Sequence, residues 1–265
     1  MSAPLIGYTE LALAAVLVLA SAILSLLLNL GYARALLVAG ARTVIQLLLV
    51  GLVLKTVFAL SSPWLIGAVM LAMLVAASYE IRARQQRRYV GLWSFGIGAA
   101  TTMLATLFVT AFALITLRPD PWFSPQVVIP LAGIVLGSVM NGVSISLNAF
   151  NTGIVRERAA IEARLALGAS RYTALKPMQR SALRSGMIPI INQMSAAGII
   201  TLPGMMTGQI LAGMAPFEAA KYQILVLFLL AGAAGLGALV ATYVAVWRTT
   251  DERDRLRLDR LVQPP

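Results

Sequence analysis

The side chains that carry most enzymatic chemistry are scarce in this 265-residue chain. It has no His and no Cys, so it lacks the commonest general base, the commonest transition-metal ligand and any thiolate nucleophile. None of Lys55, Lys176 and Lys221 follows a Gly, so no Walker A loop is present to hold ATP phosphates. No close carboxylate pair suits acid–base catalysis. We therefore predict no catalytic residue and no cofactor bound by this chain, and its metal ligands are unknown.

The longest charged interruption in the sequence, residues 156–184, has the features of a docking element. Ile161 and Leu165 fall on one face of a predicted helix, and charged residues fall on the others. Gly168 suits the left-handed position that ends a helix, and Ser170 suits the N-cap of a second helix. The pattern predicts a short amphipathic helix, a fixed turn and a second helix.

Helices that cross a membrane must position these elements. The chain is 59% hydrophobic and only 12% charged, whereas a soluble domain is about a quarter charged. A helix needs roughly 20 mostly apolar residues to cross the hydrocarbon core. The runs that qualify predict an all-α integral membrane protein, a polytopic bundle of about seven transmembrane helices: Leu11–Leu28, Thr43–Leu60, Trp64–Ala77, Leu92–Thr116, Val127–Leu147, Ile188–Leu211 and Ile224–Trp247.

The distribution of basic residues predicts the orientation of this bundle. Of the 21 Lys and Arg residues, 18 lie after the first, third, fifth and seventh runs. By the positive-inside rule, the N-terminus is outside and the C-terminus is cytoplasmic. The net charge of +11 is then explained by loops that flank membrane lipid, and no nucleic acid partner is needed. Nothing basic precedes the first run, so we interpret it as a span and not as a signal peptide.

Polar groups inside the spans are costly in lipid, so they are candidates for a substrate path. Pro203 and Gly204 interrupt the sixth run and free backbone carbonyls, which are tolerated only in a cavity or buried in protein. The thioethers beside this break prefer Cu(I), whereas Thr and Gln oxygens suit harder ions. The candidates are Glu10, Arg42, Gln46, Asn141, Met205, Met206, Thr207 and Gln209.

Each candidate also has a purely structural interpretation. Glu10 can cap the outer end of the first span, and Arg42 can extend to lipid headgroups. Asn141 lies in a stripe with Ser138 and further Ser and Asn side chains, which commonly bond neighbouring helices. Methionines fill gaps in cores. The residues by themselves therefore leave the substrate open.

No linker or soluble module divides the chain, so we expect a single transmembrane domain over residues 1–265. It carries a cytoplasmic loop over 151–187, in which Pro177 should interrupt or restart the second helix. The charged tail over 248–265 is expected to be a helix end or a disordered stub. Small residues at helix-packing spacing can join helices within the chain or across a dimer: Gly133 and Gly137, Gly204 and Gly208, and Gly232, Gly235 and Gly237.

Two resemblances to known families follow from these segments. Glu162-Ala163, with Gly168 six residues after the Glu, resembles the Glu-Ala-Ala…Gly coupling loop of ABC-transporter permeases, although Arg164 replaces the second Ala. Nearly the whole chain resembles the FetB-type iron-export permeases, a group that includes plant aluminium-tolerance permeases. The segments that carry this second resemblance are Ala41–Leu47, Val128–Gly133, Leu165–Ser170, Leu202–Gly208 and Ala220–Ile224.

The resemblance implies a permease domain, multi-pass in the bacterial inner (cytoplasmic) membrane, that exports iron or a related metal. It implies a separate cytoplasmic ABC ATPase subunit, which holds ATP and Mg, and a permease homodimer. It also implies an ATPase-coupling role for Arg158, Glu162, Arg164, Leu165, Gly168 and Ser170. The alternative is an ion-driven secondary carrier or channel without an ATPase, which would move its substrate without ATP.

Overall fold

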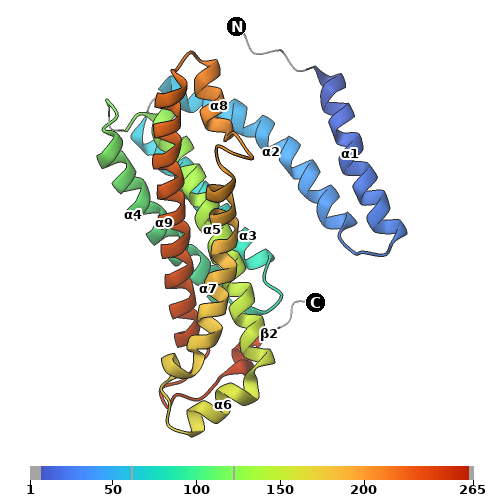
Figure 1. Ribbon diagram of the computed structural model, residues 1–265, viewed down its shortest axis with the longest axis vertical. Coiled ribbons are helices and arrows are strands. Elements are labelled where there is room, and N and C mark those ends of the chain that lie inside the picture. Colours follow the sequence, from blue (N-terminus) through green and yellow to red (C-terminus); the bar gives the residue numbers. More distant parts are fainter. Residues whose placement is uncertain (1–6, 61, 122, 263–265) are drawn as a thin grey trace. The chain divides into compact units, whose positions relative to one another are not determined.

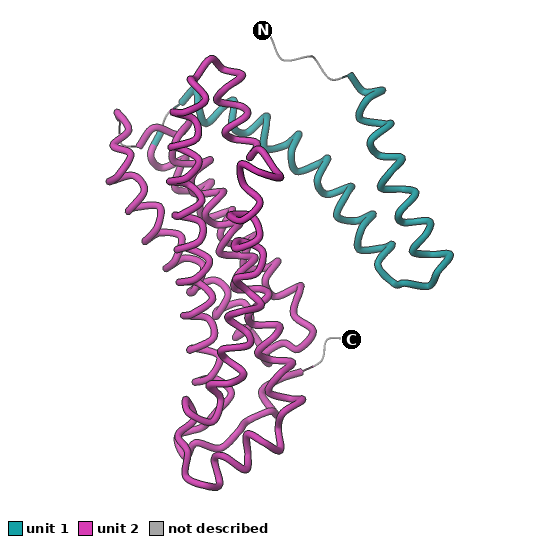
Figure 2. The backbone as a smooth tube through the Cα atoms, in the orientation of Figure 1, with its two compact units in different colours: residues 1–62 teal, residues 63–265 magenta. Residues whose placement is uncertain are grey.

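The computed structural model describes residues 7–60, 62–121 and 123–262. Within these residues the chain is helical almost throughout (Figure 1). The elements are α1 (Tyr8–Leu27), α2 (Ala33–Leu60), α3 (Pro63–Ala83), β1 (Arg88–Tyr89), α4 (Trp93–Leu117), α5 (Pro125–Arg156), α6 (Arg158–Ala166), α7 (Arg171–Ala196), α8 (Gly204–Leu211), α9 (Pro216–Arg248), a 3₁₀ turn (Leu258–Arg260) and β2 (Leu261–Val262). The chain divides into two compact units, residues 1–62 and 63–265 (Figure 2).

The first unit is a hairpin in which α1 packs against α2. The chain turns between them at Asn29 and Gly31, which adopt φ angles of 51° and 78°. The backbone N–H of Tyr32 donates to Ser25 Oγ at 3.2 Å and closes the turn. Most apolar side chains of both helices are exposed within this unit, as expected of helices whose surroundings are lipid or other protein.

In the second unit α5 is the central helix, since it packs against α3, α4, α7 and α9. Val135, Val139, Val143 and Leu147 recur every four residues along α5 and are completely buried. This spacing places them on one helix face, so α5 contributes a continuous apolar stripe to the core. On α9, Gly237 lets the two helices approach closely, because a Cβ there would lie 2.7 Å from Val139 Cγ1.

The glycine pairs predicted from spacing behave differently from one another. Gly237 packs against α5 within the chain, as predicted. Gly133 also packs within the chain, because a Cβ there would lie 3.0 Å from Met73 Cε. Gly204 and Gly208, in contrast, have open space where a Cβ would lie. The pair on α8 therefore does not pack helices within the described chain.

The predicted fold class is confirmed: within the described residues, six helices are long and apolar enough to cross a membrane, namely α1, α2, α3, α4, α5 and α9. The predicted sixth span, 188–211, is not one of them. Instead α7 ends at Ala196, Gly198 adopts a φ of 84°, and α8 begins after Pro203. Proline and glycine break the helix here as their conformational preferences predict.

The broken segment nevertheless returns the chain along the bundle. Figure 1 shows α7 beside one half of α9 and α8 beside the other end of α9, and both helices contact α9. Together they connect the end that carries α6 to the end where α9 begins. This arrangement supports a seventh crossing made of two helices. The count of seven, the orientation and the single domain remain predictions.

The expected interruption at Pro177 is wrong, because α7 runs unbroken from Arg171 to Ala196 through Pro177 and Pro189. A proline removes one backbone hydrogen bond and clashes with the carbonyl four residues earlier, which can kink a helix without ending it. Packing against α5 and α9 holds α7 together around both prolines. Tertiary packing here overrides the local preference of proline.

The charged tail is neither a helix end nor a stub, which corrects the sequence-based expectation. Its β2 strand pairs antiparallel with β1 of the α3–α4 connection, and Leu261 is buried there beside Tyr89. Arg260 Nη1 donates to the carbonyl oxygens of Arg248 and Thr250, at 2.8 and 3.2 Å. The high content of charged residues concealed this fold, because Asp251 and Arg260 use their charged side chains to bind backbone groups within the tail.

Candidate functional site

The charged stretch after α5 folds as predicted, into a helix, a glycine turn and a second helix. α6 ends in a Schellman motif: the N–H of Ala169 donates to the Arg164 carbonyl at 3.1 Å, and that of Gly168 to the Leu165 carbonyl at 3.0 Å. Gly168 has a φ of 87°, the left-handed conformation that this motif requires. Ser170 then caps α7, since its Oγ accepts the N–H of the residue three positions on, at 3.4 Å.

One face of this α6 hairpin (residues 156–176) is directed into the protein. Ile161 is completely buried, and Leu165 is partly buried against the same core. Arg164 Nη1 donates to the Ala174 carbonyl oxygen at 3.3 Å and so ties α6 to the first turn of α7. The apolar stripe that the sequence predicts therefore anchors the hairpin to the core, and its other side faces away from the core.

The outward side carries charges and one exposed leucine. Arg158 Nε lies 2.8 Å from Glu162 Oε1, and both side chains remain open to solvent. Leu167, directly before the glycine turn, is 88% exposed. Sequence reasoning missed Leu167, because it lies off the helical stripe. An apolar residue beside a helix-ending glycine was the available signal.

A second candidate region is a groove between α5, α7 and α9. We call it the α5–α7 groove; it has a volume of about 170 Å³ and is lined by the polar side chains of Ser138, Asn141 and Gln193. Ser138 Oγ donates to the Leu230 carbonyl oxygen at 3.1 Å. Pro189 on the groove wall has no N–H to donate within α7. At about 30 Å³ per water, the groove has room for roughly five waters or one hydrated ion.

Glycines set the spacing of the groove walls. A Cβ on Gly142 of α5 would lie 3.1 Å from the Ala234 carbonyl oxygen of α9. A Cβ on Gly186 of α7 would lie 2.7 Å from the Gly142 carbonyl oxygen and would overlap Ser146 Oγ. The three backbones are thus nearly in contact next to the polar side chains, which leaves little freedom for a rearrangement confined to side chains.

The predicted substrate-path residues are distributed over both units of the chain. Asn141 lines the α5–α7 groove together with Gln193, which sequence reasoning missed. Glu10, Arg42 and Gln46 belong to the first unit, on α1 and α2. The remaining four, Met205, Met206, Thr207 and Gln209, lie together on α8 and do not line the groove.

Within α8, each side chain has its own contacts. Met205 packs against the apolar core, as a gap-filling methionine does. Thr207 Oγ1 donates to the Pro203 carbonyl oxygen at 3.3 Å. Gln209 Oε1 is buried without a hydrogen bond.

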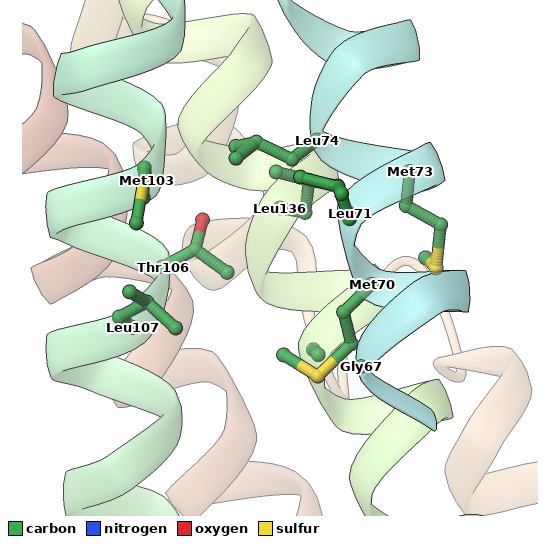
Figure 3. Close-up of a pocket in the computed structure, with 10 residues that line it drawn as sticks. Gly67, Met70, Leu71, Met73, Leu74, Met103, Thr106, Leu107 and Leu136 are labelled. Carbon is green, nitrogen blue, oxygen red and sulfur yellow. The ribbon is translucent and has the colours of Figure 1, made fainter. Parts of the chain in front are cut away.

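A separate pocket of about 240 Å³ lies between α3, α4 and α5, and methionines are among the residues that line it (Figure 3). Met70 extends from α3 and Met103 from α4, and leucines of both helices surround them. Met73 lies on the side of α3 away from Met103, so the three sulfurs do not converge. Among the described residues, no group of three His, Cys, Asp or Glu side chains could hold a metal ion. The pocket is an apolar space between spans.

The long apolar helices, the broken α7–α8 segment and the α6 hairpin define a multi-pass α-helical membrane protein. No solved structure matches the chain significantly. The chain belongs to the Uncharacterised protein family (UPF0014), whose sequence model matches residues 8–249.

Named relatives agree with this membership. UPF0014 membrane protein slr1647 of Synechocystis is 39% identical over 197 residues, 72% of this chain and 74% of the relative. Probable iron export permease protein FetB of Escherichia coli is 30% identical over 252 residues, 95% of each chain. Protein ALUMINUM SENSITIVE 3 of Arabidopsis thaliana is 33% identical over 239 residues, 90% of this chain and 85% of the relative. These matches show that the chain belongs to a family of membrane permeases.

Proposed function

We propose that this chain is the permease subunit of an ATP-driven exporter and that a separate ABC ATPase energises it. The observation that carries the proposal is the α6 hairpin, which is anchored by Ile161 and presents Leu167 and an Arg158–Glu162 pair outward. Such a capped, outward-facing element suits docking to another protein. The relative named as a permease supports the same conclusion.

The helices explain how docking would act on a substrate. Asn141 and Arg156 lie on one continuous helix, α5, so the groove and the hairpin are joined by about 22 Å of rigid backbone. α7 makes a second connection, because it runs unbroken from Arg171 beside the hairpin to Gln193 in the groove. A force applied to α6 by a partner is therefore transmitted to both groove walls. The partner would supply ATP and Mg, and this chain would bind neither.

The proposed substrate is iron or a related metal ion, in line with the name of the Escherichia coli relative. Amide and hydroxyl oxygens line the α5–α7 groove, and such oxygens suit hard cations that keep part of their water shell. Asn141 and Gln193 are exposed within this chain, and exposed amides are costly in lipid. A second copy of the chain across the groove would remove this cost, so we propose a homodimer in the bacterial inner membrane.

Reconstitution tests the proposal. The purified chain is expected to show no ATP hydrolysis alone and to show substrate-dependent hydrolysis with its ATPase partner. The variant Glu162→Ala/Gly168→Pro is expected to lose partner binding and export, since proline cannot adopt the φ of 87° at residue 168. Asp120→Ala, at an exposed carboxylate of the α4–α5 connection, is the control.

Two results would contradict this function. Export that survives in the Glu162→Ala/Gly168→Pro variant, with helix content unchanged by circular dichroism, would exclude the α6 hairpin as the coupling element. Flux of the ion through proteoliposomes of this chain alone, without ATP, would instead support an ion-driven carrier or channel.

A further inference from the structure

A pocket of about 480 Å³ lies where the folded tail meets the ends of α7 and α9. It shares no lining residue with the α5–α7 groove, and Arg171 is its one lining residue from the α6 hairpin. Guanidinium groups dominate its lining. The charged residues that line it are Arg171, Arg248, Arg253, Arg255 and Arg260, with Asp251 and Glu252.

Several of these arginines are held in place by the protein. Arg171 Nε lies 2.6 Å from Asp254 Oδ1, and its side chain is only 22% exposed. Arg260 donates to two backbone carbonyl oxygens, and both bonds come from Nη1. The N–H groups on its other two nitrogens can therefore bind a ligand. Arg248 Nε is buried and makes no hydrogen bond. A buried donor without a partner is costly, so a ligand oxygen at this position would stabilise it.

The charge balance of the pocket favours an anion. Even when Asp254 is counted with the two lining acids, the five arginines exceed the carboxylates by two. Arginine forks match the oxygens of phosphate, which they bind through paired N–H donors. A phosphate group would therefore offset part of the excess charge and accept hydrogen bonds from the open donors.

Two tryptophans place the pocket at the level of the lipid headgroups. Trp93 begins α4 and Trp247 lies in the last turn of α9; their ring centroids are 5.9 Å apart, and both residues are about half exposed. The Arg248 guanidinium carbon lies 4.5 Å from the Trp93 ring centroid. Tryptophans concentrate at membrane–water interfaces, and basic pockets on the cytoplasmic side recognise anionic headgroups. We propose that this tail pocket binds the phosphate group of an anionic lipid.

Lipid titration followed by native mass spectrometry tests the proposal on the full chain in detergent. Dioleoylphosphatidylglycerol is expected to bind at least several-fold more tightly than dioleoylphosphatidylcholine. Arg253→Gln/Arg255→Gln is expected to weaken that binding about tenfold, because two charges beside the headgroup are lost. The matched control is Arg156→Gln/Arg158→Gln, which removes two exposed arginines from surface ion pairs outside the pocket.

Equal affinity for the two lipids, or equal weakening in both double variants, would overturn the proposal. Since Arg255 also pairs with Asp251, the single variant Arg253→Gln provides a test that leaves this ion pair intact. It should weaken phosphatidylglycerol binding several-fold, and unchanged binding would count against the pocket. Inorganic phosphate alone should bind far more weakly, because it lacks acyl chains. Equal binding of phosphate would show that the ligand is a soluble anion and would overturn the lipid assignment.

Discussion

The phenol of Tyr89 donates a 2.8 Å hydrogen bond to Asn151 Oδ1, although 62 residues separate them and both side chains are buried. Asn151 Nδ2 in turn donates to the Arg87 carbonyl oxygen at 3.1 Å. Tyr89 lies in β1, which pairs with the tail, and Asn151 lies on α5 just before the α6 hairpin. This pair joins the α3–α4 connection, the tail and the base of the hairpin.

Tyr89→Phe is expected to destabilise the protein by about 1–3 kcal/mol, because it leaves Asn151 Oδ1 buried without its donor. The ring is retained, so no cavity contributes to the loss. Thermal unfolding in detergent, followed by circular dichroism, measures the effect. Tyr79→Phe, at an exposed tyrosine of α3, should leave the midpoint unchanged. A midpoint for Tyr89→Phe equal to that of Tyr79→Phe would show that the buried bond contributes nothing.

Gly186→Ala is expected to destabilise the bundle by about 1–3 kcal/mol through overpacking. The new Cβ would meet Ser146 Oγ, whose side chain can rotate, and the Gly142 carbonyl oxygen at 2.7 Å, which is fixed by α5. Gly137→Ala is the control within the bundle, since a Cβ there meets open space. That change should be neutral or stabilise α5 by up to about 1 kcal/mol. Gly186→Ala should therefore have the lower unfolding midpoint. A higher midpoint for Gly186→Ala than for Gly137→Ala would contradict the close approach of α5 and α7.

Leu167→Ser is expected to weaken binding of the proposed ATPase partner by about tenfold or more while leaving the stability of this chain unchanged. The side chain is 88% exposed, so its removal creates no cavity, whereas burial of a leucine at an interface contributes about 1.5–3 kcal/mol. Co-purification and surface plasmon resonance measure the binding. Leu92→Ser removes another leucine, 79% exposed, on the α3–α4 connection. Equal losses in the two variants would show that Leu167 has no special role in docking.

The tail is expected to undock in acid. Asp251 accepts backbone N–H bonds from Arg255 and Arg253, and the bond from Arg255 is the main cause that lowers the pKa of this carboxyl. The Arg257 guanidinium lowers the pKa of Asp259 to about 2. A lowered pKa means that the charged form stabilises the folded tail. This stabilisation is therefore complete above about pH 4, the unfolded value, and is lost as the pH falls through the folded value.

Hydrogen–deuterium exchange of residues 249–262 measures tail docking. Exchange should accelerate as the pH falls below about 4, beyond the intrinsic pH dependence of an unfolded peptide. Asp251→Asn should exchange faster already at pH 7, because the charge that accepts three bonds is gone. The control is Glu252→Gln, at the exposed neighbouring residue, and its tail should exchange at the wild-type rate. A tail that is equally protected in Asp251→Asn would contradict this role.

The membrane class and the α6 hairpin could be predicted from the sequence because both depend on local signals. Apolar length predicts spans, and Gly168 and Ser170 form the turn that their preferences indicate. The tail and the groove could not be predicted, since both depend on contacts between distant segments. Arg260 binds carbonyl oxygens of residues 248 and 250, and no local pattern specifies such a bond. Gln193 likewise becomes a groove residue only when α7 packs against α5.

The α5–α7 groove provides the test of the substrate path. Asn141→Leu and Gln193→Leu should each lower metal export by roughly tenfold, because the substitution removes a polar group that would replace water around the ion. Both residues are exposed within the chain, so folding should persist. Ile134→Leu is the control, since it alters a groove residue without adding or removing a polar group. Metal flux in proteoliposomes with the ATPase partner measures export. Full export in Asn141→Leu/Gln193→Leu would mean that the ion crosses elsewhere, and Gln209 on α8, with its buried unpaired oxygen, would then be the next residue to replace.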